Sequence, residues 1–95
     1  MSAYEICYDL QAPGQKYDRL IEKIKSYGIW CHLQQSVWVV STTQSAKEIR
    51  DNLATCLDSN DKLFVARLSG EAAWIGYSEE QSSWLKKQLD SQMAA

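Results

Sequence analysis

Hydrophobic and polar side chains alternate along the first segment of the chain, from Tyr4 to Leu10. The even-numbered side chains there are apolar, and the odd-numbered ones are Glu5, Cys7 and Asp9. Because successive side chains of a strand point to opposite faces, this pattern predicts a strand with one apolar face. An acid, Asp9, stands near its end and is the first candidate for chemistry.

The next segment changes from alternation to a helical period. Apolar side chains recur three or four residues apart from Tyr17 to Tyr27, which predicts a helix, and Gly28 is placed to end it. Two short segments rich in β-branched and aromatic residues follow, at 29–34 and 36–41. They predict two strands joined by a tight bend at Gln34-Gln35.

Two capping-box patterns predict where further helices begin. In each, a serine is followed three residues later by a glutamate or glutamine: Ser45 with Glu48, and Ser78 with Gln81. Between them, residues 62–68 are apolar in both alternating sets, which is typical of a strand buried on both faces. The predicted order is therefore βαββαβ, followed by a C-terminal strand and helix.

This order predicts an α+β, ferredoxin-like fold, in which two helices cover one face of a four-stranded antiparallel sheet. The 95 residues are enough for one domain. Its core is expected over residues 4–68, and a C-terminal extension over residues 69–92.

The second face of the sheet decides how the protein assembles. Cys7, Trp38 and Val40 are expected there, so two helices alone would leave an apolar patch in water, and such patches usually mark an interface. In one interpretation, the C-terminal helix covers the patch. In the other, which a thin core favours, two copies pack sheet to sheet as a homodimer. Residues 72–76 then add a strand to the neighbour.

The aromatic residues Trp38, Trp74 and Tyr77 are the expected contacts of that dimer interface. The net charge of −2 and the pI near 5.3 argue against a surface that attracts nucleic acid everywhere. Three cysteines are an odd number and predict free thiols in a reducing compartment. Neither a signal-peptide pattern nor an apolar stretch of membrane-spanning length is present, so a cytoplasmic location without membrane contact is expected.

Basic side chains follow one side of the first predicted helix: Lys16, Arg19 and Lys23. Their spacing suits contacts with phosphates. The acids Asp18 and Glu22 lie beside them, which favours an ordinary solvated face instead. The single histidine, His32, is suited to general acid or base catalysis, but no partner acid is identifiable and a surface or interface histidine is favoured.

Several short motifs together resemble a known family: Tyr8-Asp9, Arg19-Leu20, Tyr27-Gly28 and Gln35-Ser36-Val37-Trp38. Over residues 4–68 the chain resembles the small CRISPR-associated ferredoxin-like proteins that partner the CRISPR integrase, and more closely their SinR-family relatives. The resemblance implies a homodimer in which Asp9 of each copy lies at a divalent metal, Mg²⁺ or Mn²⁺, near the two-fold axis. It implies either a metal-dependent ribonuclease or deoxyribonuclease, or a scaffold that holds DNA without catalysis.

Two interpretations of Asp9 stay open. By the resemblance it is a metal ligand and catalytic residue; by its position alone it is a turn acid that binds amides of the following loop. The chain departs from the family in its acidic balance and in lacking a dense arginine cluster after the first strand. A dimeric module that interacts with a nucleic acid or a protein is therefore favoured, with a metal-dependent endonuclease using paired Asp9 residues as the alternative.

Overall fold

The structure is a computed structural model that describes residues 1–11 and 15–94, and the side chains within these ranges apart from those of residues 15, 16 and 90–94. Its elements are β1 (Ser2–Asp9), α1 (Gln15–Lys25), β2 (Trp30–Gln34), β3 (Val37–Thr42), α2 (Ala46–Ala54), β4 (Lys62–Arg67) and α3 (Glu79–Ala94). The predicted βαββαβ order and the C-terminal helix are confirmed.

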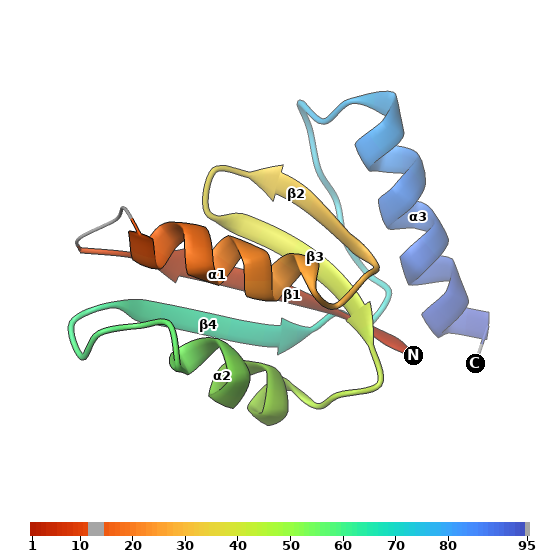
Figure 1. Cartoon of the computed structure of the whole chain (residues 1–95). Helices are drawn as coiled ribbons and strands as arrows, with labels where there is room; N and C mark the ends of the chain where they lie inside the picture. Colours follow the sequence, from red (N-terminus) through yellow and green to blue (C-terminus); the bar gives the residue numbers. More distant parts are fainter. Residues whose placement is uncertain (12–14, 95) are drawn as a thin grey trace.

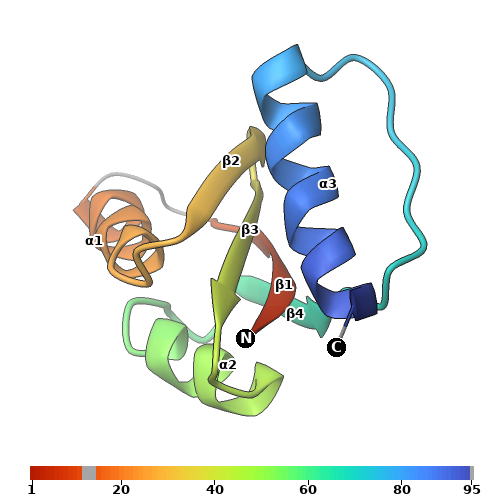
Figure 2. The same cartoon turned by 90° about the vertical axis from the view of Figure 1, so that its right-hand side faces the viewer.

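The four strands form one sheet in the order β2-β3-β1-β4, and every neighbouring pair is antiparallel. Helices α1 and α2 lie on one face of this sheet, and α3 lies on the opposite face (Figures 1 and 2). This is the ferredoxin-like α+β fold, in which α3 adds a third layer to the sheet and the pair of helices α1 and α2. None of the helices in residues 1–11 and 15–94 combines the length and the apolarity that a membrane crossing requires.

The core between the sheet and the first two helices is completely closed. Its side chains come from the even-numbered positions of β1 and from the periodic positions of the helices, as the hydrophobic pattern predicts. The side chains with 0% exposure there are Ile6, Leu20, Ile24, Val40, Ile49 and Leu53. The apolar stripe of each helix therefore finds its partner within the chain.

Trp38 and Val40 belong to this closed core, so their expected place on the second face is wrong. The β1–β3 register pairs Ile6 with Trp38 and Tyr4 with Val40, and paired residues share a face. Trp38 is 2% exposed and cannot contact another copy in this fold. Since the segment from Val37 to Val40 is apolar in both alternating sets, alternation alone does not assign its faces.

The second face carries its own, smaller core beneath α3. Ala3, Val39 and Leu85 are its buried side chains. Those packed around it are only partly buried: Leu33, Leu68, Trp74, Tyr77 and Trp84. The C-terminal helix thus covers part of this face within one chain, which was one of the two predicted arrangements.

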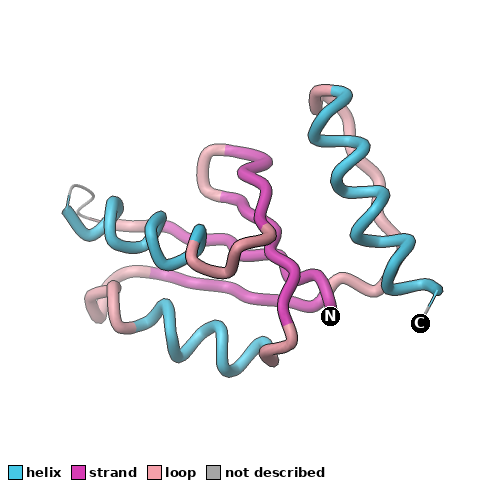
Figure 3. Tube along the Cα trace, turned by 45° about the vertical axis from the view of Figure 1, so that its right-hand side comes forward, coloured by secondary structure: helices cyan, strands magenta, loops and turns pink. Residues whose placement is uncertain are grey.

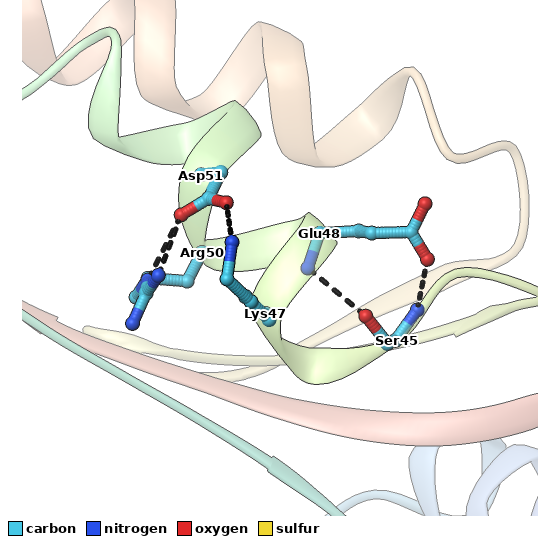
Figure 4. A network of polar contacts seen from close by, with 5 residues as sticks. All are labelled: Ser45, Lys47, Glu48, Arg50 and Asp51. Atoms are coloured by element: carbon cyan, nitrogen blue, oxygen red, sulfur yellow. Dashed lines mark hydrogen bonds and ion pairs between the residues drawn. The ribbon is translucent and has the colours of Figure 1, made fainter.

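The predicted helix starts are confirmed at both capping boxes. The Ser45 hydroxyl accepts a hydrogen bond from the Glu48 amide, and the Glu48 carboxylate accepts one from the Ser45 amide (Figure 4). The side chains of Ser78 and Gln81 exchange the same two bonds at the start of α3. Gly28, with φ of +86°, follows α1 in the left-handed conformation that its predicted role requires.

The segment between β4 and α3 contains neither strand nor helix (Figure 3). Residues 72–76 therefore form no strand within one chain, and their addition to a neighbouring sheet stays a prediction. Among the described residues, the backbone of 69–77 makes no backbone hydrogen bond. This segment therefore keeps unpaired donors and acceptors.

Candidate functional site

An open cleft of about 450 Å³ lies where β1 ends, beside the first turn of α1 and the turn between β2 and β3. It is lined by Tyr8, Asp9, Leu10, Tyr17, Asp18, Gln35 and Ser36. Two carboxylates, two phenol rings and one hydroxyl therefore meet at this end of the sheet. Four of the residues belong to motifs identified in the sequence: Tyr8, Asp9, Gln35 and Ser36.

A buried hydrogen-bonded chain fixes the shape of the cleft. The Trp38 indole N–H donates to the Tyr8 hydroxyl at 3.1 Å, and that hydroxyl reaches the Gln35 carbonyl at 3.5 Å. The Tyr8 amide donates to the Ser36 carbonyl at 3.2 Å. These contacts hold the β2–β3 turn against the end of β1. Trp38 of the Gln35-Ser36-Val37-Trp38 motif therefore has a structural role, because its indole binds the Tyr8 hydroxyl.

The rings around this chain are tightly packed. His32 stacks on Trp38 with 4.0 Å between ring centroids and 8° between planes, and its Nε2 lies 3.2 Å from the Gln35 carbonyl. Burial, and then the nearby Tyr17 hydroxyl, raise the pKa of Tyr8 to about 12, although the Trp38 hydrogen bond opposes them. His32 is thus an exposed residue that supports the turn, in line with the favoured interpretation of it.

Asp9 is an exposed residue at the rim of the cleft. Among the described residues its carboxylate makes no hydrogen bond or ion pair. Asp61 instead takes the role expected of a turn acid, because it accepts a hydrogen bond from the Gln11 amide at 2.9 Å and another from the Asp58 amide at 2.8 Å. The following loop includes residues 12–14, which lie outside the described part of the chain, so both interpretations of Asp9 stay open.

Asp18 is the cleft residue that the sequence did not single out. It stands in the first turn of α1 and is exposed. In the sequence it counted only as a charge beside the basic stripe. Its position opposite the end of β1 depends on how α1 packs on the sheet, and no local pattern predicts this.

The three basic candidates are not equivalent. Lys23 donates a hydrogen bond to the Asn52 side chain at 3.2 Å, so it joins α1 to α2. Arg19 is exposed on α1. Lys16 belongs to α1, but its side chain lies outside the described part of the chain. A continuous phosphate-binding stripe therefore loses one of its three members to a structural contact.

The oxygen atoms of the cleft suit a hard divalent cation in type. Mg²⁺ and Mn²⁺ prefer carboxylate, hydroxyl and carbonyl oxygens with several waters, and Asp9, Asp18 and Ser36 offer such atoms. Within the described residues, however, no three His, Cys, Asp or Glu side chains gather closely enough to hold a metal ion. At this cleft, the described residues of one chain supply two carboxylates, those of Asp9 and Asp18.

A shallower pocket of about 250 Å³ lies on the second sheet face, next to the same end of β1. Cys7 and Phe64 face each other across the β1–β4 pair there, and Asp9 faces Lys62. Phe64 is 61% exposed. Burial, and then the charge of Glu5, raise the pKa of the Cys7 thiol. We call Cys7, Val37 and Phe64 the open patch.

Trp74 and Tyr77, two predicted interface residues, contact their own chain. The Trp74 indole donates to the Ser82 hydroxyl at 3.0 Å, and the Tyr77 hydroxyl donates to the Gln34 side chain at 2.6 Å. Their rings stack at 6.4 Å and line an open groove of about 530 Å³ at the end of β2. Both stay partly exposed, so a role in contacts between copies remains a prediction.

No protein-family model matches this chain. Among solved structures, it is similar to the crystal structure of the hypothetical protein TT1823 from Thermus thermophilus. The two are 23% identical, with a TM-score of 0.64 over 79% of this chain and 90% of that one. This likeness supports the fold and carries no information on activity.

Proposed function

We propose that this protein is a homodimeric interaction module that binds a protein partner without catalysis. The observation that carries the proposal is the unequal cover of the second sheet face, where α3 buries Ala3 and Val39 while Phe64 stays 61% exposed. A large aromatic side chain in the middle of a strand is costly to leave in water unless another molecule covers it.

The charges around the open patch suit a second copy. Asp9 and Lys62 lie opposite each other in adjacent strands at its border. A two-fold axis through the patch would let Lys62 of one copy approach the acid of the other, so the surface is self-complementary. β4 also pairs only with β1 among the described residues, which leaves its outer edge open to an added strand.

The extended segment at 72–76 supports the same arrangement. Its backbone groups are unpaired within one chain, and an open strand edge is what such groups would bind in a neighbour. The nearby Glu71 is opposite in charge to Lys62 and Arg67, which stand at the two ends of β4. Strand addition between copies would therefore give the backbone groups of residues 72–76 hydrogen-bond partners and bring Glu71 near the basic residues of β4.

Charge favours a protein over a nucleic acid as the partner of the dimer. The chain carries −2, two acids border the cleft, and Lys23 is held by Asn52. A phosphate backbone needs several free cations along one face. Binding of a nucleic acid by the wild-type dimer would replace the partner class in this proposal and leave the dimer intact.

Light scattering across a concentration series tests the dimer. We expect Phe64→Ser to raise the dimer dissociation constant by about tenfold or more, since a buried aromatic anchor often contributes 2 kcal/mol at an interface. Glu22→Ser, on the outer side of α1, is the matched control and should not change it. A wild-type chain that stays monomeric at all concentrations would refute the proposed dimer.

A metal-dependent endonuclease is the second candidate, and the two carboxylates of Asp9 and Asp18 in one cleft favour it. A divalent ion held there would polarise a phosphodiester and activate a water molecule. Because one chain supplies only two carboxylates, Asp9 from each copy would have to approach the same ion. The nuclease therefore also depends on the dimer.

Cleavage of labelled single- and double-stranded RNA and DNA with Mg²⁺ or Mn²⁺ separates the two candidates. The nuclease predicts cleavage that disappears in Asp9→Asn, with the dimer preserved. Asp51→Asn, an acid on the outside of α2, is the control and should cleave like the wild type. An absence of cleavage by a folded dimer would leave the interaction module as the only candidate.

A further inference from the structure

The C-terminal part of the chain forms a unit with its own internal contacts, which we call the cap (Trp74 to Leu89). The Trp74 indole binds Ser82 in α3, the rings of Trp74 and Tyr77 stack, and the capping box of Ser78 and Gln81 starts the helix. The loop before α3 and the helix itself are thus joined to each other independently of the sheet.

The hydrogen bonds between the cap and the sheet lie at β2, while Leu85 packs with Ala3 and Val39 in the small core beneath α3. The Gln81 side-chain amide donates to the His32 carbonyl at 3.1 Å and reaches the Leu33 carbonyl at 3.4 Å. Tyr77 binds Gln34 on the same strand. All three of these bonds are exposed or only partly buried, so water can replace them at small cost.

The link between the cap and β4 is suited to movement. The last backbone bond before it runs from the Leu68 amide to the Ala3 carbonyl at 2.9 Å. Residues 69–73 then form no strand or helix and are largely exposed (Figure 3). Gly70 has φ of +99°, a conformation that glycine adopts without strain. Local opening is easiest where such a link meets few buried contacts.

The face under the cap continues directly into the open patch. Ala3, Glu5 and Cys7 follow one another on the same side of β1, and Phe64, Ala66 and Leu68 do so along the neighbouring strand. The three residues of the open patch are few beside the 20 to 30 per side that a stable interface usually contains. A dimer that used only the uncovered half would therefore be small.

We propose that the cap opens as one body, and that the face beneath it is the second half of the surface on which a second copy binds. The inference rests on the proposed dimer and adds its regulation: the docked cap limits self-association, and the open cap enlarges the interface. Opening also frees residues 72–76, the segment expected to add to a neighbouring sheet.

The three native cysteines report on this opening without any added probe. Cys7 lies in the open patch, whereas Cys56 is buried in the core between the sheet and the first two helices. Cys31 is paired with Val39 and so shares the face of β2 that the cap approaches. Burial raises the pKa of both Cys7 and Cys31, so each rate is compared with that of the same cysteine in the wild type.

The test is the rate at which a maleimide labels each cysteine, measured by mass spectrometry on dilute protein. Gln81→Ala removes the bonds to β2, and we expect it to speed labelling of Cys31 by about threefold to tenfold. Tyr77→Phe should act in the same direction. Cys56 should keep its rate in both variants, and Ser83→Ala, on the exposed side of α3, should change neither cysteine.

At high protein concentration, we expect Gln81→Ala to dimerise more tightly than the wild type and to protect Cys31 from the maleimide. The proposal is overturned if Cys31 keeps its rate in both cap variants, if Cys56 accelerates equally, or if the loosened cap does not strengthen the dimer. If the wild type and the Gln81→Ala variant both remain monomers, the proposed dimer is refuted. The labelling rate of Cys31 then still shows whether the cap opens.

Discussion

On one face of the sheet, α1 and α2 bury side chains such as Leu20 and Leu53 completely, whereas on the other face α3 leaves Phe64 61% exposed. In β3 and β4 both alternating sets of side chains are apolar, so hydrophobicity alone does not separate the two faces there. The two faces differ in how much of each is covered. Two helices, α1 and α2, close the core on the first face, whereas the single helix α3 covers only part of the second face. Stability is thus expected to reside on the first face and interaction on the second.

The same contrast appears in how the helices are attached. α2 begins with a capping box and directs Ile49 and Leu53 into the closed core. α3 also begins with a capping box, but the core beneath it is small, and its hydrogen bonds to the sheet are exposed or partly buried ones from Gln81 and from the preceding Tyr77 to the edge strand. A capping box therefore shows that a helix is well formed, but it does not show that the helix is firmly packed on the sheet.

The largest expected effect on stability comes from truncating one buried leucine to alanine on each face of the sheet. Leu53→Ala should lower the free energy of unfolding by about 3 kcal/mol, because a completely buried leucine leaves a cavity. Leu85→Ala, on the side of the cap that faces the sheet, should cost about 2 kcal/mol or less, since its surroundings can move away. Urea denaturation of both variants measures this, and an equal or reversed order would contradict the contrast between the faces.

The next effect concerns the buried contact at the end of β1. Tyr8→Phe leaves the Trp38 indole N–H without its acceptor, which should cost about 1 to 3 kcal/mol. Tyr4→Phe is the matched control on the same face, because among the described residues its hydroxyl makes no hydrogen bond. Similar losses in both variants would show that the Trp38 contact contributes little.

The pH dependence of Tyr8 sharpens the same test. Its pKa is raised in the folded state to about 12, so the folded chain keeps a proton that the unfolded chain releases near pH 10. This stability is complete below pH 10 and is lost as the pH rises toward 12. Ultraviolet titration should show a phenol that titrates near pH 12 and disappears in Tyr8→Phe.

A smaller effect is expected from the two capping boxes. Ser45→Ala should destabilise the whole domain by about 1 kcal/mol, because α2 belongs to the closed core. Ser78→Ala should instead speed hydrogen exchange in α3 and leave the global transition nearly unchanged. Equal global losses would mean that α3 folds and unfolds together with the rest.

The smallest effect is expected on the outside of α2. Hydrogen bonds from Lys47 and Arg50 lower the pKa of Asp51 (Figure 4). Their contribution is present above the ordinary aspartate pKa and is lost as the pH falls below it. Because the pairs are exposed, Asp51→Asn should not shift the thermal midpoint measurably at pH 7. A clear shift would show that this surface network contributes more than its exposure suggests.

Local signals in the sequence predicted most of the fold. Alternation in β1, the helical period of α1 and both serine caps each act within a few residues, and all appear in the structure. The β2–β3 turn lies at Gln35 and Ser36, one residue beyond the expected bend. Such features need no knowledge of distant contacts.

The parts that could not be predicted depend on contacts between distant segments. Trp38 was placed on the wrong face because every residue from Val37 to Val40 is apolar, and only pairing with β1 fixes the register. Asp18 joins Asp9 only after α1 packs on the sheet. The contacts of Gln81 with β2 span about 50 residues, and no periodicity encodes them.

The most direct test of the account is hydrogen exchange of the wild-type chain at a low and a high protein concentration. The account predicts that peptides from β1 and β4 exchange more slowly at high concentration, while peptides from α1 and α2 exchange at the same rate at both. Exchange that is independent of concentration, or protection confined to α1 and α2, would contradict the assignment of the second sheet face to self-association.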